Sequence, residues 1–154
     1  MKREKVDVNY KAADPAGYSS TPLPKKLGLK EGHVVAFVAL PEPLEFLASS
    51  AKFEECERRT SWCGFRKPAR FDVIHAFTTQ RVDLEAGLPG MMAALAPAGM
   101  IWVSWPKKAA KVATDITEDT LRDVALPLGL VDVKVCAVDA VWSGLKLVIR
   151  KDRR

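Results

Sequence analysis

One apolar run constrains the fold of this chain more than any other feature. Residues His33–Leu40 form a continuous stretch of strand length, rich in β-branched and aromatic side chains. An unbroken run of this kind is typical of a strand buried on both faces of a parallel sheet. Phe71–Phe77 and Met100–Trp105 predict two further strands, and Pro106 ends the second of them.

Helical stretches separate these strands. Prolines and glycines mark their limits, because proline suits a first helical position and glycine suits a left-handed helix end. We expect a short helix from Thr21 to Gly28 and a second helix over Glu42–Ser50 that buries Leu44, Phe46 and Leu47. A third helix is expected over about Val82–Ala96, with an interruption at 87–90. A fourth is expected to be capped by Asp115 with Glu118 and closed by Gly129. A weak strand is expected near Phe53–Glu57.

The C-terminal part adds a hairpin. Val131–Val138 and Gly144–Ile149 are separated by about five residues, too few for the crossover that parallel strands need, so these strands must be antiparallel. Alternating strands and helices predict a single α/β domain, three-layered and Rossmann-like, with a mostly parallel sheet and a C-terminal antiparallel hairpin. We expect an N-terminal arm over 1–21, the α/β domain over 22–150 and a basic tail over 151–154.

The positive charge of the chain lies mostly at its ends. The 154 residues carry a formal net charge of +5, of which residues 1–7 contribute +1 and residues 150–154 contribute +3. Residues 8–149 therefore keep only +1, whereas a nucleic-acid-binding domain concentrates its positive charge on one folded face. Nucleic acid is accordingly not expected as the main partner.

Cysteine usage and hydropathy favour a cytoplasmic protein. The three cysteines stand at irregular positions and form no disulfide framework. No apolar run reaches the ~20 residues of a membrane span, and the polar start Met1–Lys5 does not resemble a signal peptide. Cys56 and Cys63 lack the second pair of ligands that zinc needs, so no metal and no membrane partner are expected.

Three segments carry a resemblance to a known fold. Leu27–Gly32 (LGLKEG) leads into the first strand, Phe71–Phe77 (FDVIHAF) is a middle strand, and Leu95–Trp105 (LAPAGMIWVSW) joins a helix end to the next strand. Together with the terminal hairpin, these segments resemble the Rossmann-like fold of the S-adenosylmethionine-dependent methyltransferases.

Longer strings resemble a second group of proteins. Residues 17–28 (GYSSTPLPKKLG), 105–108 (WPKK) and 131–146 (VDVKVCAVDAVWSGLK) are similar to a family of small bacterial domains of unknown function. The insert around Arg58–Lys67 departs from the pattern of that family.

The methyltransferase resemblance implies a cofactor site that this sequence matches poorly. Those enzymes hold the cofactor in a glycine-rich turn after the first strand, where the backbone must approach the ligand closely. Here the corresponding stretch, Ala39–Leu44, contains two prolines and no glycine. The acidic residue that ends the second strand and binds the ribose hydroxyls would be Glu54, Glu55 or Glu57, none of which the pattern places well. We therefore expect no cofactor, with S-adenosylmethionine as the alternative.

Polar side chains gather where the predicted strands end. In open α/β sheets, ligands bind beyond the carboxyl ends of the strands. The candidates there are Thr78, Thr79, Arg81, Ser104, Trp105, Lys107 and Lys108. Their hydroxyls and cations suit a phosphate or a carboxylate. A solvated strand end would carry the same side chains, so both interpretations stay open.

A second cluster lies in the loop after the weak strand. It comprises Arg58, Arg59, Trp62, Arg66, Lys67 and Arg70. An aromatic ring among cations suits nucleic acid or an acidic protein, although a solvated charged loop has the same composition. No Ser or Cys has an evident base partner, so no catalytic residue is expected, and His75 is expected in the core.

These observations favour a non-enzymatic function. The leading hypothesis is a binding or regulatory domain that recognises an anionic small molecule or a partner protein. The first alternative is an S-adenosylmethionine-dependent methyltransferase with a degenerate cofactor loop. The second is a weak nucleic-acid-binding protein that uses the Arg58–Arg70 loop and the basic tail.

Overall fold

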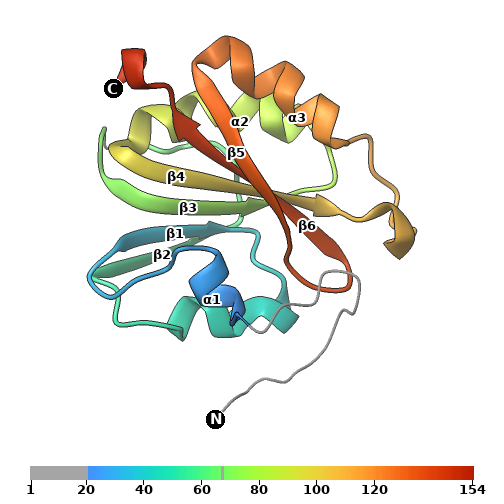
Figure 1. Ribbon diagram of the computed structural model, residues 1–154, viewed down its shortest axis with the longest axis horizontal. Helices are drawn as coiled ribbons and strands as arrows, with labels where there is room; N and C mark the ends of the chain where they lie inside the picture. Colours follow the sequence, from blue (N-terminus) through green and yellow to red (C-terminus); the bar gives the residue numbers. More distant parts are fainter. Residues whose placement is uncertain (1–20, 67) are drawn as a thin grey trace.

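The chain folds around a single mixed β-sheet. The computed structural model describes residues 21–66 and 68–154, so the expected arm over 1–21 lies almost wholly outside the described residues. The sheet has six strands in the order β2-β1-β3-β4-β6-β5, as Figure 1 shows. The strands are β1 (Val34–Val38), β2 (Glu55–Arg59), β3 (Phe71–Phe77), β4 (Leu95–Pro106), β5 (Leu130–Ala137) and β6 (Trp142–Ile149).

The strand directions confirm the predicted topology. Strand β1 pairs in parallel with β2 and β3, and β3 pairs in parallel with β4. Strand β6 runs antiparallel to both β4 and β5, because the short connection between β5 and β6 forbids a crossover. The result is the expected α/β Rossmann-like sheet with a C-terminal antiparallel hairpin.

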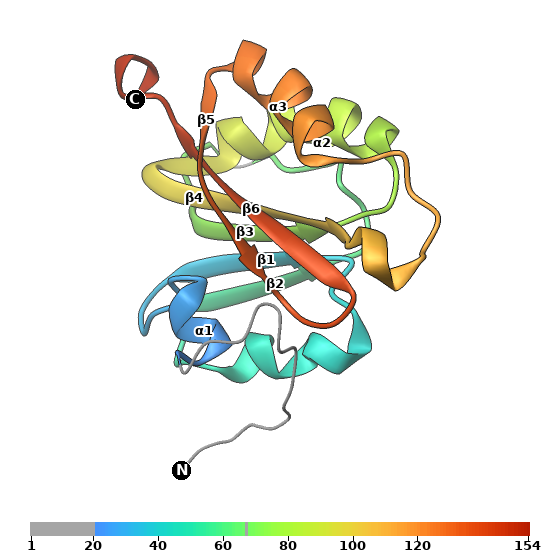
Figure 2. The same cartoon turned by 45° about the vertical axis from the view of Figure 1, so that its right-hand side comes forward.

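Helices cover both faces of the sheet and complete the three layers. The α-helices are α1 (Leu23–Lys26), α2 (Arg81–Ala94) and α3 (Glu118–Ala125), and the 3₁₀ helices are η1 (Glu42–Ser49), η2 (Lys108–Ala110), η3 (Leu126–Leu128) and η4 (Lys151–Arg153). Figures 1 and 2 show α2 and α3 on one face, and α1 with the segment after β1 on the other.

The core alternates between the two faces along each strand. Ala36 and Ile74 belong to the apolar cluster beneath α2 and α3. Their chain neighbours Phe37 and Val73 belong to the cluster beneath α1 and η1. Since successive side chains of a strand point to opposite faces, apolar residues at every position are needed to fill both layers. This explains the unbroken run at 33–40.

Two local predictions about the helices are wrong. Phe46 was expected to be buried, but it is 41% exposed, because a 3₁₀ helix turns more tightly than an α-helix and moves this residue off the buried face. Helix α2 is continuous through Pro89, where an interruption was expected. Pro89 is exposed, while Leu84 and Leu88 on the opposite side are fully buried, so packing holds the helix together despite the proline.

The cap of α3 also differs from the prediction. Thr117, not Asp115, is the N-cap, and its hydroxyl accepts a hydrogen bond from the Thr120 backbone N–H in a reciprocal capping box. Asp115 instead accepts a hydrogen bond from the backbone N–H of Arg81 and so ties the start of α2 to this loop. Threonine at N3 performs the role that glutamate usually has, which is why the spacing of Asp115 and Glu118 misled the prediction.

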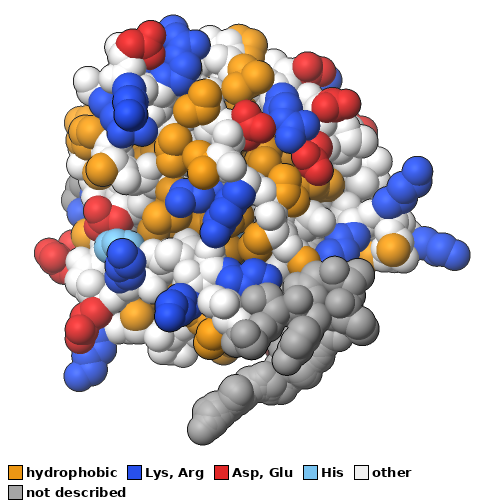
Figure 3. All heavy atoms as spheres, viewed as in Figure 1, with side chains coloured by type: hydrophobic (Ala, Val, Ile, Leu, Met, Phe, Trp, Pro, Cys, Tyr) orange, Lys and Arg blue, Asp and Glu red, His pale blue; other side chains and the backbone are white. Residues whose placement is uncertain are grey.

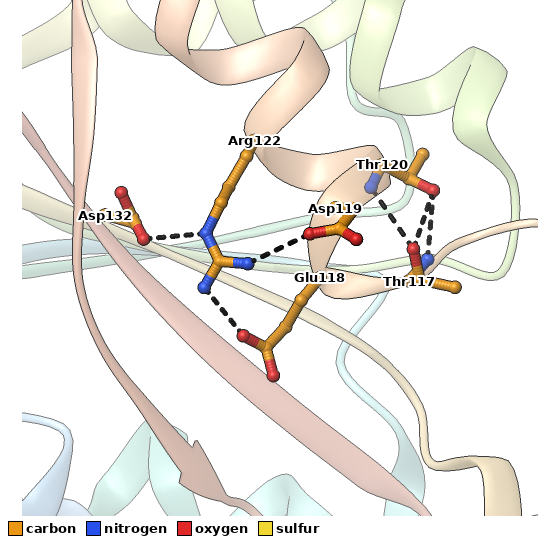
Figure 4. A network of polar contacts seen from close by, with 6 residues as sticks. All are labelled: Thr117, Glu118, Asp119, Thr120, Arg122 and Asp132. Carbon is orange, nitrogen blue, oxygen red and sulfur yellow. Dashed lines mark hydrogen bonds and ion pairs between the residues drawn. The ribbon is translucent and has the colours of Figure 1, made fainter.

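An ion-pair network fastens α3 to the edge strand. The Arg122 guanidinium contacts Glu118 and Asp119 on its own helix and Asp132 on β5, as Figure 4 shows. The Arg122–Asp132 contact is 2.9 Å long, and the Arg122 hydrogen bond holds the pKa of Asp132 below its usual value. The network therefore joins a helix of one layer to the edge strand of the sheet.

Candidate functional site

We use the word crevice for the position at the carboxyl edge of the sheet, between β1 and β3, where this topology would receive a ligand. From β1 the chain moves outward to β2, and from β3 it moves in the opposite direction to β4. The point between β1 and β3 is therefore the topological switch point, where ligands of open α/β sheets bind. The turn after β1 and the residues after β3 border this crevice.

The turn after β1 adopts a conformation that usually requires glycine. Ala39 follows the last residue of β1 with a φ of 56°, in the left-handed region that side chains with a Cβ disfavour. Its backbone N–H donates to the carbonyl oxygen of Arg59 at 2.8 Å, which fixes the turn to the end of β2. Leu40 and Pro41 follow, and η1 begins at Glu42. The backbone thus turns sharply at this point without a glycine.

The end of β2 carries arginines in place of a carboxylate. Arg58 pairs with Glu45 of η1, and Arg59 contacts Glu57 at 2.6 Å. The acidic candidates on this strand do not reach its carboxyl end. Glu54 precedes β2, and Glu55 is its first residue. Acidic side chains therefore reach the two arginines at this end of β2 both from η1, through Glu45, and from β2 itself, through Glu57.

The residues after β3 are committed to structure. The Thr78 hydroxyl donates to the Asp83 carboxylate and accepts a hydrogen bond from the Gln80 N–H. The carbonyl oxygen of Thr79 accepts hydrogen bonds from the loop before α3. Arg81 pairs with Glu85 one turn later in α2 at 2.9 Å. These three predicted site residues border the crevice, but their contacts organise the start of α2.

The candidates on β4 divide into buried and exposed residues. Ser104 is fully buried and its hydroxyl lies 2.7 Å from Nε2 of His75. Trp105 is 7% exposed and belongs to the core. Lys107 donates its backbone N–H to Val141 at 2.6 Å, and Lys108 begins η2. Of this predicted anion-binding set, the two lysines and Arg81 supply the cations near the carboxyl edge.

His75 lies in the core, as predicted. Its side chain is 1% exposed and stacks on Phe77 with ring centroids 4.3 Å apart. Burial lowers the pKa of His75 to about 3, so the imidazole is neutral at physiological pH. Its Nδ1 atom has no hydrogen-bond partner. A neutral, buried histidine of this kind does not exchange protons with a substrate.

The loop after β2 buries its aromatic residue. Trp62 is 4% exposed, and its indole N–H donates to the carbonyl oxygen of Phe77 at 3.0 Å. The ring packs against Gly87 of α2, where an added Cβ would lie 2.7 Å from the Trp62 carbonyl oxygen. Trp62 therefore packs against α2, next to the last residue of β3.

The remaining members of this cluster are dispersed over the end of β2 and the loop that follows it. Arg59 lies over the Phe65 ring at 4.1 Å from its centroid. Arg70 pairs with Glu55 and lies over Phe71. Arg66 is exposed, and Lys67 lies outside the described residues. The structure thus engages Arg58, Arg59 and Arg70 with carboxylates and leaves Trp62 inside the fold.

Comparison with known proteins supports the fold. No protein-family model matches the chain, and no curated protein matches its sequence. Among solved structures, a SAM-dependent methyltransferase from Aquifex aeolicus is 15% identical with a TM-score of 0.63, over 81% of this chain and 86% of that chain. A TehB-like SAM-dependent methyltransferase from Corynebacterium glutamicum is 13% identical with a TM-score of 0.53, over 88% and 91%.

A third similar structure contains the demethylated cofactor. It is phosphoethanolamine N-methyltransferase 2 from Haemonchus contortus with S-adenosylhomocysteine, 11% identical with a TM-score of 0.60, over 82% of this chain and 51% of that chain. At these identities the likeness shows the fold, which is the methyltransferase-like Rossmann fold that the sequence resembles.

These neighbours overturn two expectations. We expected a non-catalytic binding or regulatory domain and no cofactor. The three structures named above are instead methyltransferases described as SAM-dependent or carrying S-adenosylhomocysteine, and they favour the methyltransferase alternative. The expectation rested on the missing glycines of the turn, yet Ala39 adopts the left-handed conformation without one.

The structure also bears on metals and membranes. In the described residues no three His, Cys, Asp or Glu side chains come together as a metal site would require. Within the same residues, no helix has both the length and the apolar character needed to cross a bilayer.

The turn after β1 has the left-handed conformation that a glycine would provide, while the side chains around it differ from those that the methyltransferase resemblance implies. The left-handed turn at Ala39 lies at the end of β1, beside the switch point. The acidic residue usual at the end of β2 is replaced by arginine. Glu42, the first residue of η1, is exposed at the same edge of the sheet and is the carboxylate closest in the chain to the turn.

Proposed function

We propose that this chain is an S-adenosylmethionine-dependent methyltransferase that binds its cofactor in the crevice between β1 and β3. The left-handed turn at Ala39, directly after β1 at the switch point, is the observation that carries the proposal. An alanine held at a φ of 56° is a strained backbone, and strain of this kind concentrates at ligand sites. The similarity of the fold to methyltransferases supports the same assignment.

Residues of three segments would hold the cofactor. The turn 39–42 supplies backbone groups beside the ligand, in the place of a glycine-rich loop. We assign to Glu42 the role of accepting hydrogen bonds from the ribose hydroxyls, because carboxylates make strong charge-assisted hydrogen bonds. Trp62 excludes water from the α2 side of the crevice, where its indole is anchored to Phe77. The bound cofactor would supply an electrophilic methyl group.

The methyl acceptor would enter beside the ends of β3 and β4. Arg81, Lys107 and Lys108 place positive charge there, which supports an anionic small molecule or an acidic protein as the acceptor. Nucleic acid is not expected, because Arg58 and Arg59 at the end of β2 and Arg70 before β3 are paired with carboxylates. We also propose that the protein acts in the cytoplasm and belongs with the small bacterial domains whose strings it resembles.

Ligand-induced stabilisation tests the proposal. S-Adenosylhomocysteine at ~100 times its dissociation constant adds about 2.7 kcal/mol to the free energy of unfolding, which raises the melting temperature of a domain of this size by roughly 5–10 °C. Glu42→Ala should reduce this rise at a given ligand concentration.

The matched control is Glu54→Ala. Glu54 is also exposed, but it precedes β2 at the opposite edge of the sheet, so its loss changes the net charge equally and should leave the response intact. A folded wild-type protein whose melting temperature does not respond to millimolar S-adenosylmethionine or S-adenosylhomocysteine would refute the proposal. Equal responses of both variants and the wild type would refute the role of Glu42 alone.

A further inference from the structure

A hollow lies at the edge of the sheet opposite the crevice. Its volume is about 450 Å³, within the ~300–1,000 Å³ range of small-molecule sites. The end of α2, the start of β4, η3, the end of β6 and the C-terminal turn surround it; its lining residues are Pro89, Met92, Ala93, Leu95, Pro97, Leu128, Ile149, Arg153 and Arg154. Leu95 pairs with Phe71, the first residue of β3, which places the hollow at the amino edge of the parallel strands.

The wall of the hollow is apolar. Leu95 and Ile149 are core residues at its base, with 2% and 6% of their surfaces exposed. Met92 and Leu128 are half-buried on its sides. A concave apolar surface of this kind gains free energy when a hydrocarbon group displaces water from it. The wall therefore selects a ligand with an apolar body.

The polar side chains of the lining are both arginines. Arg153 donates to the carbonyl oxygen of Leu128 at 3.4 Å, and Arg154 donates to the carbonyl oxygen of Ile149 at 2.7 Å. Neither guanidinium forms an ion pair with any residue of the described chain. Elsewhere Arg81 and Arg122 both contact carboxylates. Two guanidinium groups with unused donors at an apolar hollow favour an anionic head group.

The absence of a side chain at Gly129 leaves room for Arg153. Gly129 has a φ of 105°, and an added Cβ there would lie 3.2 Å from the guanidinium carbon of Arg153. Backbone and side-chain packing thus bring Arg153 against η3, beside the hollow. In the view of Figure 3, basic side chains lie beside hydrophobic ones in the region where Figure 1 draws the C-terminal turn.

We propose that this hollow binds a small amphipathic carboxylate. Its hydrocarbon body lies against the apolar wall, and its carboxylate accepts hydrogen bonds from Arg153 and Arg154. The site is separate from the crevice between β1 and β3, and it does not depend on the methyltransferase assignment. Binding involves no covalent step.

Octanoate is the probe, and calorimetry and NMR are the measurements. Titration of the full chain with octanoate, without S-adenosylmethionine, should show saturable binding and should shift the methyl resonance of Met92. The Met100 methyl, which lies near Gly28 on the other side of the sheet, should not shift. Octanol and octylammonium, which keep the chain length but lose the negative charge, should bind at least about tenfold more weakly.

Three variants separate the parts of the proposal. R153Q/R154Q should weaken octanoate binding at least about tenfold. R150Q/K151Q removes the same charge from residues outside the lining and should leave binding unchanged. Ala93→Phe, at an exposed position of the wall, should fill the hollow and weaken binding without unfolding the protein. Unchanged binding in R153Q/R154Q, equal binding of octylammonium, or no Met92 shift in the folded wild type would each overturn the proposal.

Discussion

The contact between Trp62 and Gly87 makes the most specific prediction about this fold. An added Cβ at Gly87 would lie 2.7 Å from the carbonyl oxygen and 2.8 Å from the Cβ of Trp62. Distances below 3.0 Å demand a shift, and here the obstructing atoms are backbone and Cβ, which cannot rotate away. Gly87→Ala must therefore displace Trp62 from α2.

The change in the free energy of unfolding of Gly87→Ala combines two destabilising contributions with one stabilising contribution. Overpacking costs about 1–3 kcal/mol, and leaving the buried Phe77 carbonyl without its Trp62 partner costs about 1–3 kcal/mol if the hydrogen bond breaks. Replacing a glycine inside a helix with alanine recovers ~1 kcal/mol. We expect Gly87→Ala to lower the free energy of unfolding by about 1–3 kcal/mol. This corresponds to a melting temperature lower by roughly 3–10 °C.

Gly90→Ala is the matched control in the same helix. Nothing lies within 4 Å of a Cβ added at Gly90, so this variant should gain the helical contribution alone and be stabilised by about 0.5–1 kcal/mol. Urea denaturation monitored by circular dichroism measures both values. If Gly87→Ala is as stable as Gly90→Ala, the close packing of Trp62 on α2 is wrong, and with it the proposed exclusion of water by Trp62.

Two further predictions concern pH. The pKa of Asp132 is lowered by its hydrogen bond to Arg122, so its contribution to stability is present above the unfolded pKa of about 4 and is lost as pH falls through the lower folded pKa. Asp132→Asn should thus be less stable than wild type at neutral pH and equal to it in strong acid. The control Asp119→Asn, at a side chain 91% exposed, should change stability little at either pH. A difference in stability between Asp132→Asn and wild type that persists in strong acid would contradict the ion-pair explanation. Burial lowers the pKa of His75 to about 3. Between about pH 6.5 and pH 3 the unfolded chain therefore binds a proton at this histidine that the folded chain does not. As the pH falls through this range, His75 should lower the free energy of unfolding by about 1.4 kcal/mol per pH unit. His75→Leu should remove that part of the slope in denaturation curves measured from pH 7 to pH 4, and an unaltered slope would show that His75 does not cause it.

The strands were predictable because their signal is local. Phe71–Phe77 occupies β3 with the predicted limits, since a strand buried on both faces must be apolar at nearly every position. The antiparallel hairpin followed from the length of one connection. Each of these inferences rests on neighbouring residues of the chain.

Features that depend on distant residues were not predictable in the same way. Trp62 lies in an aperiodic, basic loop, and only its contacts with Gly87 and Phe77 reveal that it is buried. Helix α2 continues through Pro89 because buried residues on its other side hold it against the sheet. Local composition describes such a segment as exposed or broken, and tertiary packing decides otherwise.

The turn at Ala39 shows why a missing glycine is a weak argument against a cofactor site. Glycine is favoured after β1 in dinucleotide-type folds because it enters the left-handed region without strain. Alanine in that region costs about 1–2 kcal/mol, and the hydrogen bond from its N–H to the Arg59 carbonyl offsets part of this cost. Because that bond joins the turn to the end of β2, the same interaction that holds the strained residue also sets the spacing of the two strand ends. The chain thus holds at an alanine, with the help of a hydrogen bond, a turn that glycine would adopt without strain, so the missing glycine does not by itself argue against the proposed cofactor site.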